Sequence, residues 1–250
     1  MSEVLDIAMK NGRWTECPSC KEVIITQRLK ENLWVCPNCG FHFRLSHDRR
    51  LDITCDSDSF EALSLPGESP AKNEGQVLAD DVLKGGSASI KGYSCVVGVM
   101  DFSNRGGSMG VSTAQMVVFL MKSAQGLKKP LVLFCSSGGV RVQEGIWGLM
   151  QMLRTVHARN LVEDIPLITV FTDPCLGGVT ASFASLADIM IAEPGARIGF
   201  AGPRVIESTI NYKVPPDFHN AEKLLSSGFL DMVVHRHNMR DTLAYLLRWF

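Results

Sequence analysis

Four cysteines near the start of the chain form two matched pairs, Cys17 and Cys20 in "CPSC" and Cys36 and Cys39 in "CPNC". The fifteen residues between the pairs suit a hairpin that brings two tight knuckles together. Four thiolates at tetrahedral positions suit Zn²⁺, and a complete four-ligand shell is typical of a structural metal. The pattern therefore predicts one structural zinc ion per chain. A redox pair or two disulfides are the alternative interpretations.

Two glycines, Gly138 and Gly139, lie within "CSSGGVRVQEG", where an apolar run ends and a helix-like run begins. A turn from strand to helix leaves backbone N–H groups without partners, and glycine lets another molecule approach the backbone closely. Two such N–H groups can hold a developing oxyanion. The sequence thus predicts that Gly138 and Gly139 are catalytic, while the alternative is an ordinary tight turn.

Two further glycine pairs occupy similar turns and are predicted to bind substrate. Gly106 and Gly107 lie in "RGGSMG", and Gly177 and Gly178 lie in "DPCLGGVTAS". Since the three turns fall at the carboxyl ends of predicted strands, we expect them to form a site at one edge of the fold. Such a site suits a carbonyl-containing ligand that becomes an enolate.

Two arginines accompany these turns: Arg141 follows Gly138 and Gly139, and Arg204 lies in "GFAGPRVIE". Each is predicted either to contact a phosphate or carboxylate of the ligand or to fix its own segment through hydrogen bonds. Cys135 and Cys175 lie in or beside apolar runs and are interpreted as small core residues. The alternative, a cysteine nucleophile, has no recognisable histidine partner in the sequence.

The elements that hold these residues alternate along the chain. Strands are predicted over 93–102, 130–136, 166–173 and 189–194, and helices over 112–126, 142–160 and 177–188, with Ser108 or Ser112 as the cap of the first helix. This alternation predicts an α/β domain with largely parallel strands. Composition divides the chain into a zinc ribbon at 13–50, an acidic, turn-rich connecting segment at 51–86 and an α/β domain at 87–250.

Hydrophobic residues make up 46% and charged residues 20% of the 250 residues, and the formal net charge is −1. This composition is typical of a globular chain without overall attraction to nucleic acid or membrane. Residues 13–50 carry seven Lys/Arg and four Asp/Glu, so a net +3 falls to +1 once four thiolates and one Zn²⁺ are counted. Nucleic-acid binding is therefore not expected. Without a long apolar span or a secretory signal, the predicted location is cytoplasmic.

Several longer motifs carry a resemblance to a known family: "WTECPSC", "VCPNCGFHFRLS", "GGSMG", "SSGGVRVQEG", "TDPCLGGVTASFA" and "IAEPGARIGFAGPRVIE". In this order they resemble the β subunits of bacterial acetyl-CoA carboxylase carboxyltransferase, over about 14–50 and 87–240. The resemblance implies a crotonase-like ββα superhelix behind the zinc ribbon. It also implies that Gly138 and Gly139 hold a thioester oxygen, and that Gly177 and Gly178 lie near the acyl-CoA pocket.

The resemblance further implies a transferase that moves a carboxyl group from carboxybiotin to acetyl-CoA and forms malonyl-CoA for fatty acid biosynthesis. Carboxybiotin would be carried by a biotin carboxyl carrier protein, and an α-type subunit would complete an α₂β₂ assembly. Two other functions stay open at this point. One is a biotin-independent decarboxylase or other CoA-thioester enzyme of a specialised pathway, and the other is a non-catalytic binding or regulatory protein built around the ribbon.

Overall fold

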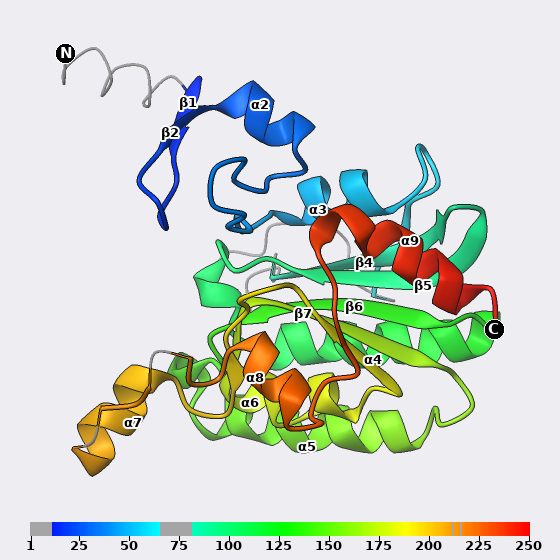
Figure 1. Cartoon of the computed structure of the whole chain (residues 1–250). Coiled ribbons are helices and arrows are strands. Elements are labelled where there is room, and N and C mark those ends of the chain that lie inside the picture. The colour runs from blue at the N-terminus through cyan, green and yellow to red at the C-terminus, as the bar shows by residue number, and fades with distance from the viewer. Residues whose placement is uncertain (1–11, 66–81, 212, 216) are drawn as a thin grey trace, which may run out of the picture. The chain divides into compact units, whose positions relative to one another are not determined.

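The structure is a computed structural model that describes residues 12–65, 82–211, 213–215 and 217–250 (Figure 1). The chain forms two compact units, of which the first ends at Leu45 and the second begins at Ser46. Both ends of the predicted connecting segment belong to elements of the second unit, α3 (His47–Thr54) and β4 (Leu83–Ile90). Residues 66–81 of that segment lie outside the described residues.

The first unit contains a short antiparallel hairpin of β1 (Trp14–Glu16) and β2 (Val23–Ile25), followed by α2 (Thr26–Glu31). Its apolar interior is small, with Ile24 and Leu29 among the buried side chains. A unit of this size usually needs a metal or disulfides in addition to its core.

The second unit is built on an eight-stranded sheet with the order β10-β8-β7-β6-β5-β4-β3, and β9 pairs with β7 off this path. Its remaining strands are β3 (Glu61–Ala62), β5 (Tyr93–Met100), β6 (Leu131–Ser137), β7 (Leu167–Leu176), β8 (Ile189–Ala192), β9 (Ile198–Gly199) and β10 (Met232–Val233). Strands β5, β6, β7, β8 and β10 are parallel, whereas β3 and β4 form an antiparallel extension. Parallel strands end at the same edge, so the segments that follow β6 and β7 begin side by side.

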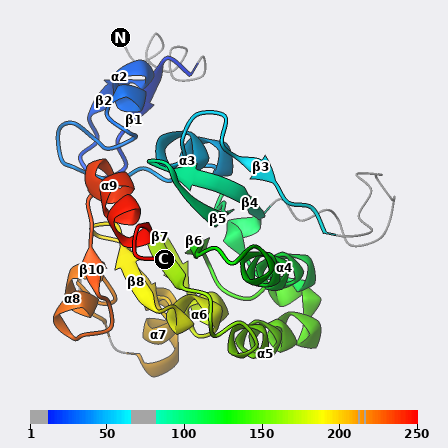
Figure 2. The same ribbon diagram turned by 90° about the vertical axis from the view of Figure 1, so that its right-hand side faces the viewer.

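Helices cover both faces of this sheet, with α4 (Val111–Leu127) and α5 (Ile146–Asn160) on one face and α3 and α9 (Arg236–Leu247) on the other (Figures 1 and 2). Strand β6 shows how the sequence produces this arrangement. Leu131 and Leu133 belong to the core with α4, while Val132 and Phe134 belong to the core with α9. Because alternate residues of a strand face opposite sides, a strand buried on both faces is apolar throughout.

Short elements connect these layers at their ends. They are η1 (Arg105–Gly107), η2 (Val142–Glu144), α6 (Gly177–Thr180), η3 (Phe183–Leu186), α7 (Pro203–Ile210) and α8 (Ala221–Ser226). No helix of the described residues has the length and apolar character needed to cross a membrane.

The four predicted strands are confirmed as β5, β6, β7 and β8, but the helices differ in detail. Gly110, rather than Ser108 or Ser112, occupies the cap position of α4. The helix predicted over 142–160 is interrupted at Gly145, whose φ of 53° is incompatible with a continuous α-helix. The helix predicted over 177–188 is the single turn α6 followed by η3. The apolar pattern located these segments, whereas backbone turns inside them set the breaks.

Candidate active site and metal centre

The four predicted metal ligands lie together, with all their sulfur atoms within 4.8 Å of one another. The Sγ atoms of Cys17 and Cys39 are 3.7 Å apart, as are those of Cys20 and Cys36. A tetrahedral Zn²⁺ with Zn–S bonds of about 2.3 Å holds its sulfurs about 3.8 Å apart, whereas a disulfide bond is about 2.05 Å long. The four thiols are therefore unpaired and fit a zinc ion as its complete set of protein ligands.

Both cysteine pairs occupy the same kind of backbone turn. Lys21 N–H donates to Cys17 O and Gly40 N–H donates to Cys36 O, each at 2.9 Å. Lys21 and Gly40 both have a positive φ, of 62° and 74°. The matched spacing of the two pairs thus corresponds to one turn geometry used twice.

The surroundings of the sulfur atoms differ within the cluster. Asn38 Nδ2 donates to Cys20 Sγ at 3.4 Å, and this hydrogen bond is the main reason why the pKa of the Cys20 thiol is lowered to about 6. Burial instead raises the pKa of Cys17 to about 12. Because Zn²⁺ binds thiolates, metal binding at this cluster displaces a proton from the buried thiol of Cys17.

The glycine turns are numbered in chain order, and the first of them, at Gly106 and Gly107, lies against the end of β6. Gly138 N–H donates to Gly106 O at 2.8 Å, and Ser137 Oγ donates to Gly107 O at 2.6 Å. A Cβ on Gly107 would lie 2.1 Å from Ser136 O, and the φ of Gly107 is 62°, so only glycine fits there. The first and second turns are therefore joined through their backbones.

The second and third turns are in direct contact as well. A Cβ on Gly177 would lie 2.8 Å from Gly139 Cα, and a Cβ on Gly178 would lie 2.3 Å from Val140 Cγ2. No side chain separates the backbones of Gly139 and Gly177. The structure thus brings the three glycine turns together at the carboxyl edge of β6 and β7, while their roles toward a ligand stay predictions.

The N–H groups of Gly138 and Gly139, which the sequence analysis assigns to an oxyanion, are both used inside the chain. Gly138 N–H donates to Gly106 O at 2.8 Å, and Gly139 N–H donates to Ser137 Oγ at 3.0 Å. A donor that is paired within the protein must give up that bond before it can hold a ligand oxygen. The two predicted donors are therefore occupied in this structure, whereas other N–H groups of the same turns have no partner within the described residues.

Val140 and Gly178 carry such N–H groups. Val140 forms an isolated parallel bridge with Met109. Met109 N–H donates to Gly139 O at 2.8 Å, and Arg141 N–H donates to Met109 O at 2.9 Å. Since peptide groups alternate in direction along an extended strand, the Val140 N–H points away from Met109. Gly178 lies in the first turn of α6, where N–H groups have no partner within the helix. Within the described residues, neither N–H donates to the chain.

Arg141 is buried, with 5% of its surface exposed, and its guanidinium is bonded to its own chain. It donates to Glu144 Oε1 and to Ser108 O, each at 2.9 Å. Glu144 Oε2 in turn accepts the Val111 N–H at 2.7 Å and so replaces a side-chain cap at the start of α4. Of the two roles predicted for Arg141, the contacts in the structure are those of fixing the turn.

Three other candidates lie at or near the same edge. Arg204 belongs to α7, of which the structure describes the backbone at this residue but not the side chain, so its ligand contact stays a prediction. Cys135 and Cys175 are fully buried, and burial raises the pKa of both thiols, that of Cys175 to about 12. Buried thiols that resist ionisation are poor nucleophiles, which agrees with their interpretation as core residues.

Sequence reasoning missed two residues of this edge, Ser137 and Val140. Ser137 is fully buried, and its hydroxyl group joins the first two turns by donating to Gly107 O and accepting from Gly139 N–H. A serine after an apolar run carries no signal for this role. The free N–H of Val140 follows only from the bridge to Met109, a contact that the sequence alone does not reveal.

Comparison with known proteins adds to this geometry. Residues 44–244 match the family described as "Carboxyl transferase domain", and residues 14–39 match the family described as "Acetyl-CoA carboxylase zinc finger domain". The acetyl-coenzyme A carboxylase carboxyl transferase subunit beta of Carboxydothermus hydrogenoformans is 42% identical over 253 residues, covering 96% of this chain and 90% of its own length. A similar protein of Natranaerobius thermophilus, named for both subunits beta and alpha, is 41% identical, and the match covers 95% of this chain but 42% of that protein.

Solved structures show the same fold. The transcarboxylase 12S, crystallised as a hexamer with hydrolysed methylmalonyl-coenzyme A bound, has a TM-score of 0.71 and 27% identity, and the match covers 82% of this chain and 42% of the transcarboxylase chain. A Pseudomonas malonate decarboxylase hetero-tetramer in complex with malonate has a TM-score of 0.70 and 23% identity, with 82% of each chain covered. The likeness to the malonate decarboxylase shows a shared fold only.

Proposed function

The chain belongs to the carboxyl transferase family, and from this premise we propose that it is the acyl-CoA-binding β-type subunit of an acetyl-CoA carboxylase carboxyltransferase. The reaction transfers a carboxyl group from carboxybiotin to acetyl-CoA and gives malonyl-CoA. The chain is thus a transferase with a crotonase-like fold and an N-terminal zinc ribbon.

The observation that carries this proposal is the contact between the glycine turns, which leaves the N–H groups of Val140 and Gly178 to a ligand. We assign the thioester oxygen of the acyl-CoA to these two donors. When the α carbon loses its proton, negative charge develops on this oxygen, and hydrogen bonds to it become stronger. Donors held by packed turns need no reorganisation at that moment, so they stabilise the enolate more than the substrate.

The glycines themselves are assigned a supporting part in this site. Gly138 and Gly139 hold the turn that presents the Val140 N–H, and Gly177 allows the third turn to touch it. Gly106 has a φ of 65°, and a Cβ there would meet nothing within 4 Å, so space lies beside this glycine. We assign this side of the first turn, with Gly107, to the approach of the acyl-CoA.

Two cofactors belong to this function. Carboxybiotin, bound to a separate carrier protein, supplies CO₂ and the base for the α-carbon proton, while this chain binds and orients the thioester. Zn²⁺ is structural, since four cysteine thiolates complete its shell and leave no position for substrate. Its part is to hold the ribbon unit together.

A carboxyl transferase α subunit is the proposed partner. The Natranaerobius thermophilus protein is named for both subunits, and the present chain matches 42% of it, which supports a second, α-type part in the working enzyme. An α₂β₂ assembly and a biotin carboxyl carrier protein as the donor's carrier are proposed on the same grounds. A cytoplasmic location is supported by the need of the zinc site for four reduced thiols.

The test is reconstitution from purified parts. With a purified carboxyl transferase α subunit and carboxybiotin as donor, the chain should form malonyl-CoA from acetyl-CoA, and each subunit alone should not. Liquid chromatography of the CoA esters measures the product. Decarboxylation of malonyl-CoA by the single chain without biotin would instead support the decarboxylase alternative. The absence of any CoA-ester turnover in a verified complex would favour the non-catalytic one.

A further inference from the structure

Arg105 is an exposed arginine at the first glycine turn, where it opens η1 and directly precedes Gly106 and Gly107. Within the described residues, its guanidinium has no hydrogen-bond or ion-pair partner. The acid nearest to it in the sequence, Asp101, is 4% exposed and accepts hydrogen bonds from Ser103 instead. The positive charge of Arg105 is therefore available to a ligand.

Other arginines of this edge are already paired within the chain. Arg141 and Glu144 form an ion pair at 2.9 Å. Arg197 donates to both carboxylate oxygens of Asp173, at 2.7 and 2.9 Å. Compared with these two residues, Arg105 brings an uncompensated positive charge to the edge.

The backbone of Arg105 is in the left-handed region, with a φ of 50°, and Gly106 and Gly107 follow with 65° and 62°. Glycine and asparagine adopt this conformation with less strain than an arginine does. The turn itself thus gives no reason for an arginine at this position. Strained residues of this kind are concentrated at ligand sites, which directs attention to the side chain.

Arg105 also lies close to the candidate acyl site. The next residue, Gly106, accepts the Gly138 N–H at 2.8 Å and so joins the turn that presents the Val140 N–H. A Cβ on Gly106 would meet nothing within 4 Å, so the space beside Arg105 is open. A ligand whose thioester lies at Val140 can therefore leave the site past this side chain.

We propose that Arg105 binds a phosphate group at the nucleotide end of the acyl-CoA. The identity of the ligand rests on the proposed function. Acetyl-CoA carries all of its negative charge on phosphates, namely the pyrophosphate and the 3′-phosphate, because its acetyl group is neutral. A guanidinium stays charged and offers two parallel N–H groups to phosphate oxygens, which makes arginine well suited to this contact.

The test uses Arg105→Asn, which suits the left-handed backbone and removes the charge. The control, Lys122→Gln, removes one positive charge from an exposed position of α4. In the reconstituted enzyme, Arg105→Asn should raise the KM for acetyl-CoA about 10-fold with kcat unchanged, the size expected for one hydrogen bond to a charged group. Arg105→Lys should restore part of this loss, and the control should match the wild type.

Two truncated substrates separate a phosphate contact from an effect on the turn. With S-acetylpantetheine, which keeps the thioester and lacks every phosphate, kcat/KM of Arg105→Asn should equal that of the wild type. A loss of the 10-fold difference with acetyl-dephospho-CoA would assign the contact to the 3′-phosphate, and its retention would assign it to the pyrophosphate. An equal KM for acetyl-CoA in both proteins, or an equal defect with S-acetylpantetheine, would overturn the proposal.

Calorimetric titration of the same complexes with CoA keeps this proposal separate from the proposed function. Arg105→Asn should weaken CoA binding about 10-fold, and equal binding by both proteins would overturn the role of Arg105 while leaving carboxyl transfer intact. Binding of CoA that depends on Arg105 without any carboxyl transfer would support the phosphate contact and contradict the proposed function instead.

Discussion

Neighbouring side chains leave no room for a Cβ at Gly178, although its backbone conformation is open to other residues. Gly178 is therefore the most suitable residue for testing the proposed acyl site. A Cβ there would lie 2.3 Å from Val140 Cγ2 and 2.8 Å from Met152 Sδ. Gly139, by contrast, has a φ of 121°, so any side chain there would strain the backbone as well. A side chain at position 178 would therefore push on Val140 in the neighbouring turn without straining the backbone of residue 178 itself.

We expect Gly178→Ala to lower the turnover of the reconstituted enzyme about 10²-fold, the size typical for loss of an oxyanion donor, because the new methyl group displaces Val140. The control is Gly126→Ala in α4, where a Cβ meets nothing within 4 Å. This change should preserve turnover and slightly raise stability. Steady-state kinetics and thermal unfolding of both variants provide the measurement. Wild-type turnover in a folded Gly178→Ala enzyme would remove this residue from the site.

The sequence predicts those site residues whose type and spacing can be recognised within a short stretch of the chain. The cysteine ligands follow from spacing within each pair, and the glycine pairs from their position after apolar runs. The choice of N–H donor does not follow in this way, since it depends on the bridge between Met109 and Val140. The role of Arg141 likewise depends on Ser108, which lies 33 residues earlier in the sequence.

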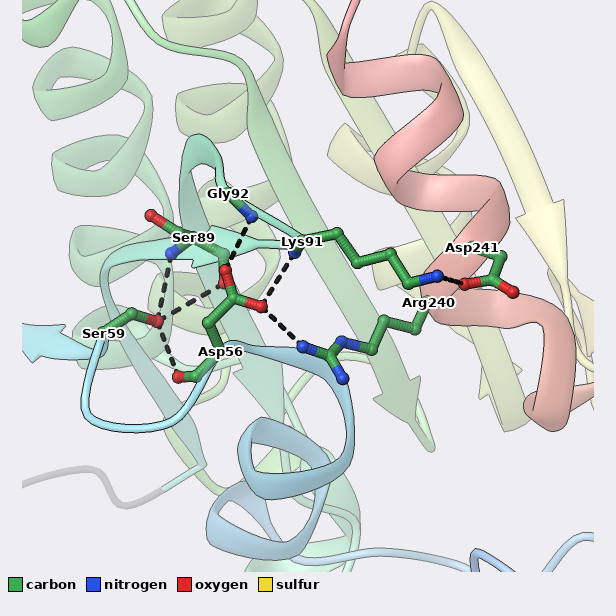
Figure 3. A network of polar contacts seen from close by, with 7 residues as sticks. All are labelled: Asp56, Ser59, Ser89, Lys91, Gly92, Arg240 and Asp241. Atoms are coloured by element: carbon green, nitrogen blue, oxygen red, sulfur yellow. Dashed lines mark hydrogen bonds and ion pairs between the residues drawn. The ribbon is translucent and has the colours of Figure 1, made fainter.

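Among the elements, the loop after α3 is tied to the β4–β5 hairpin and to α9 by one carboxylate, that of Asp56 (Figure 3). It accepts the N–H groups of Lys91 and Gly92, each at 2.8 Å, and Arg240 Nη2 donates to it at 2.5 Å. Lys91 Nζ forms an ion pair with Asp241 of α9. The pKa of Asp56 is lowered, foremost by the hydrogen bond from Gly92 N–H.

Replacing Asp56 with Ala should lower the free energy of unfolding by about 1–2 kcal/mol at pH 7, because two N–H groups and Arg240 lose an ionised acceptor. Since the pKa of Asp56 is lower in the folded than in the unfolded state, its stabilisation is present above the unfolded value of about 3.9 and is lost as the pH falls through the folded value. Denaturant unfolding at pH 7 and at a series of pH values below about 3.9 measures both effects.

The control for this prediction is Asp52→Ala, on the exposed side of α3, which should change stability by less than about 0.5 kcal/mol. A difference between the two variants that stays constant down to the acid-unfolding range would contradict the assigned pH dependence. Equal stability of both variants at pH 7 would show that the carboxylate of Asp56 does not hold these elements together.

The sequence predicts the strands and helices in which apolar residues recur regularly. It does not predict an element that forms only because it pairs with another strand. Strand β4 has the sequence "LKGGSASI", in which glycine and serine favour other structures. It is a strand because all eight of its residues pair with β5. Both of its glycines are closely packed, since a Cβ on Gly85 would lie 2.5 Å from Leu120 Cδ1 and one on Gly86 would lie 2.3 Å from the backbone oxygen of Glu61.

At the scale of the whole molecule, the two units have separate interiors. Both apolar cores of the second unit consist of residues from Leu51 onward, and the first unit contains the sulfur cluster. Removal of zinc should therefore unfold the first unit and leave the sheet and its helices folded, because small zinc modules depend on their metal.

Cys36→Ser is the change that tests this separation. We expect lower zinc content by elemental analysis and faster amide hydrogen exchange over residues 12–45, with unchanged exchange in the core strands of the second unit. Cys55→Ala, which removes a buried thiol outside the cluster, should retain one zinc ion per chain. Wild-type protein that is purified without chelators and contains no zinc would contradict the metal assignment, and loss of protection in both units would contradict their independence.

Helix α5 carries large apolar side chains that are exposed in this chain, namely those of Ile146, Trp147, Leu149, Met150 and Leu153, and this has a consequence for how cells must supply it. A copy made in excess of its partner presents Trp147, Leu149 and Leu153 to solvent, and such surfaces are prone to aggregation and to recognition by chaperones and proteases. Balanced synthesis of the two subunits would avoid the loss of excess copies to aggregation and proteolysis. Joining both in one polypeptide, as the name of the Natranaerobius thermophilus relative indicates, fixes their ratio at the level of translation.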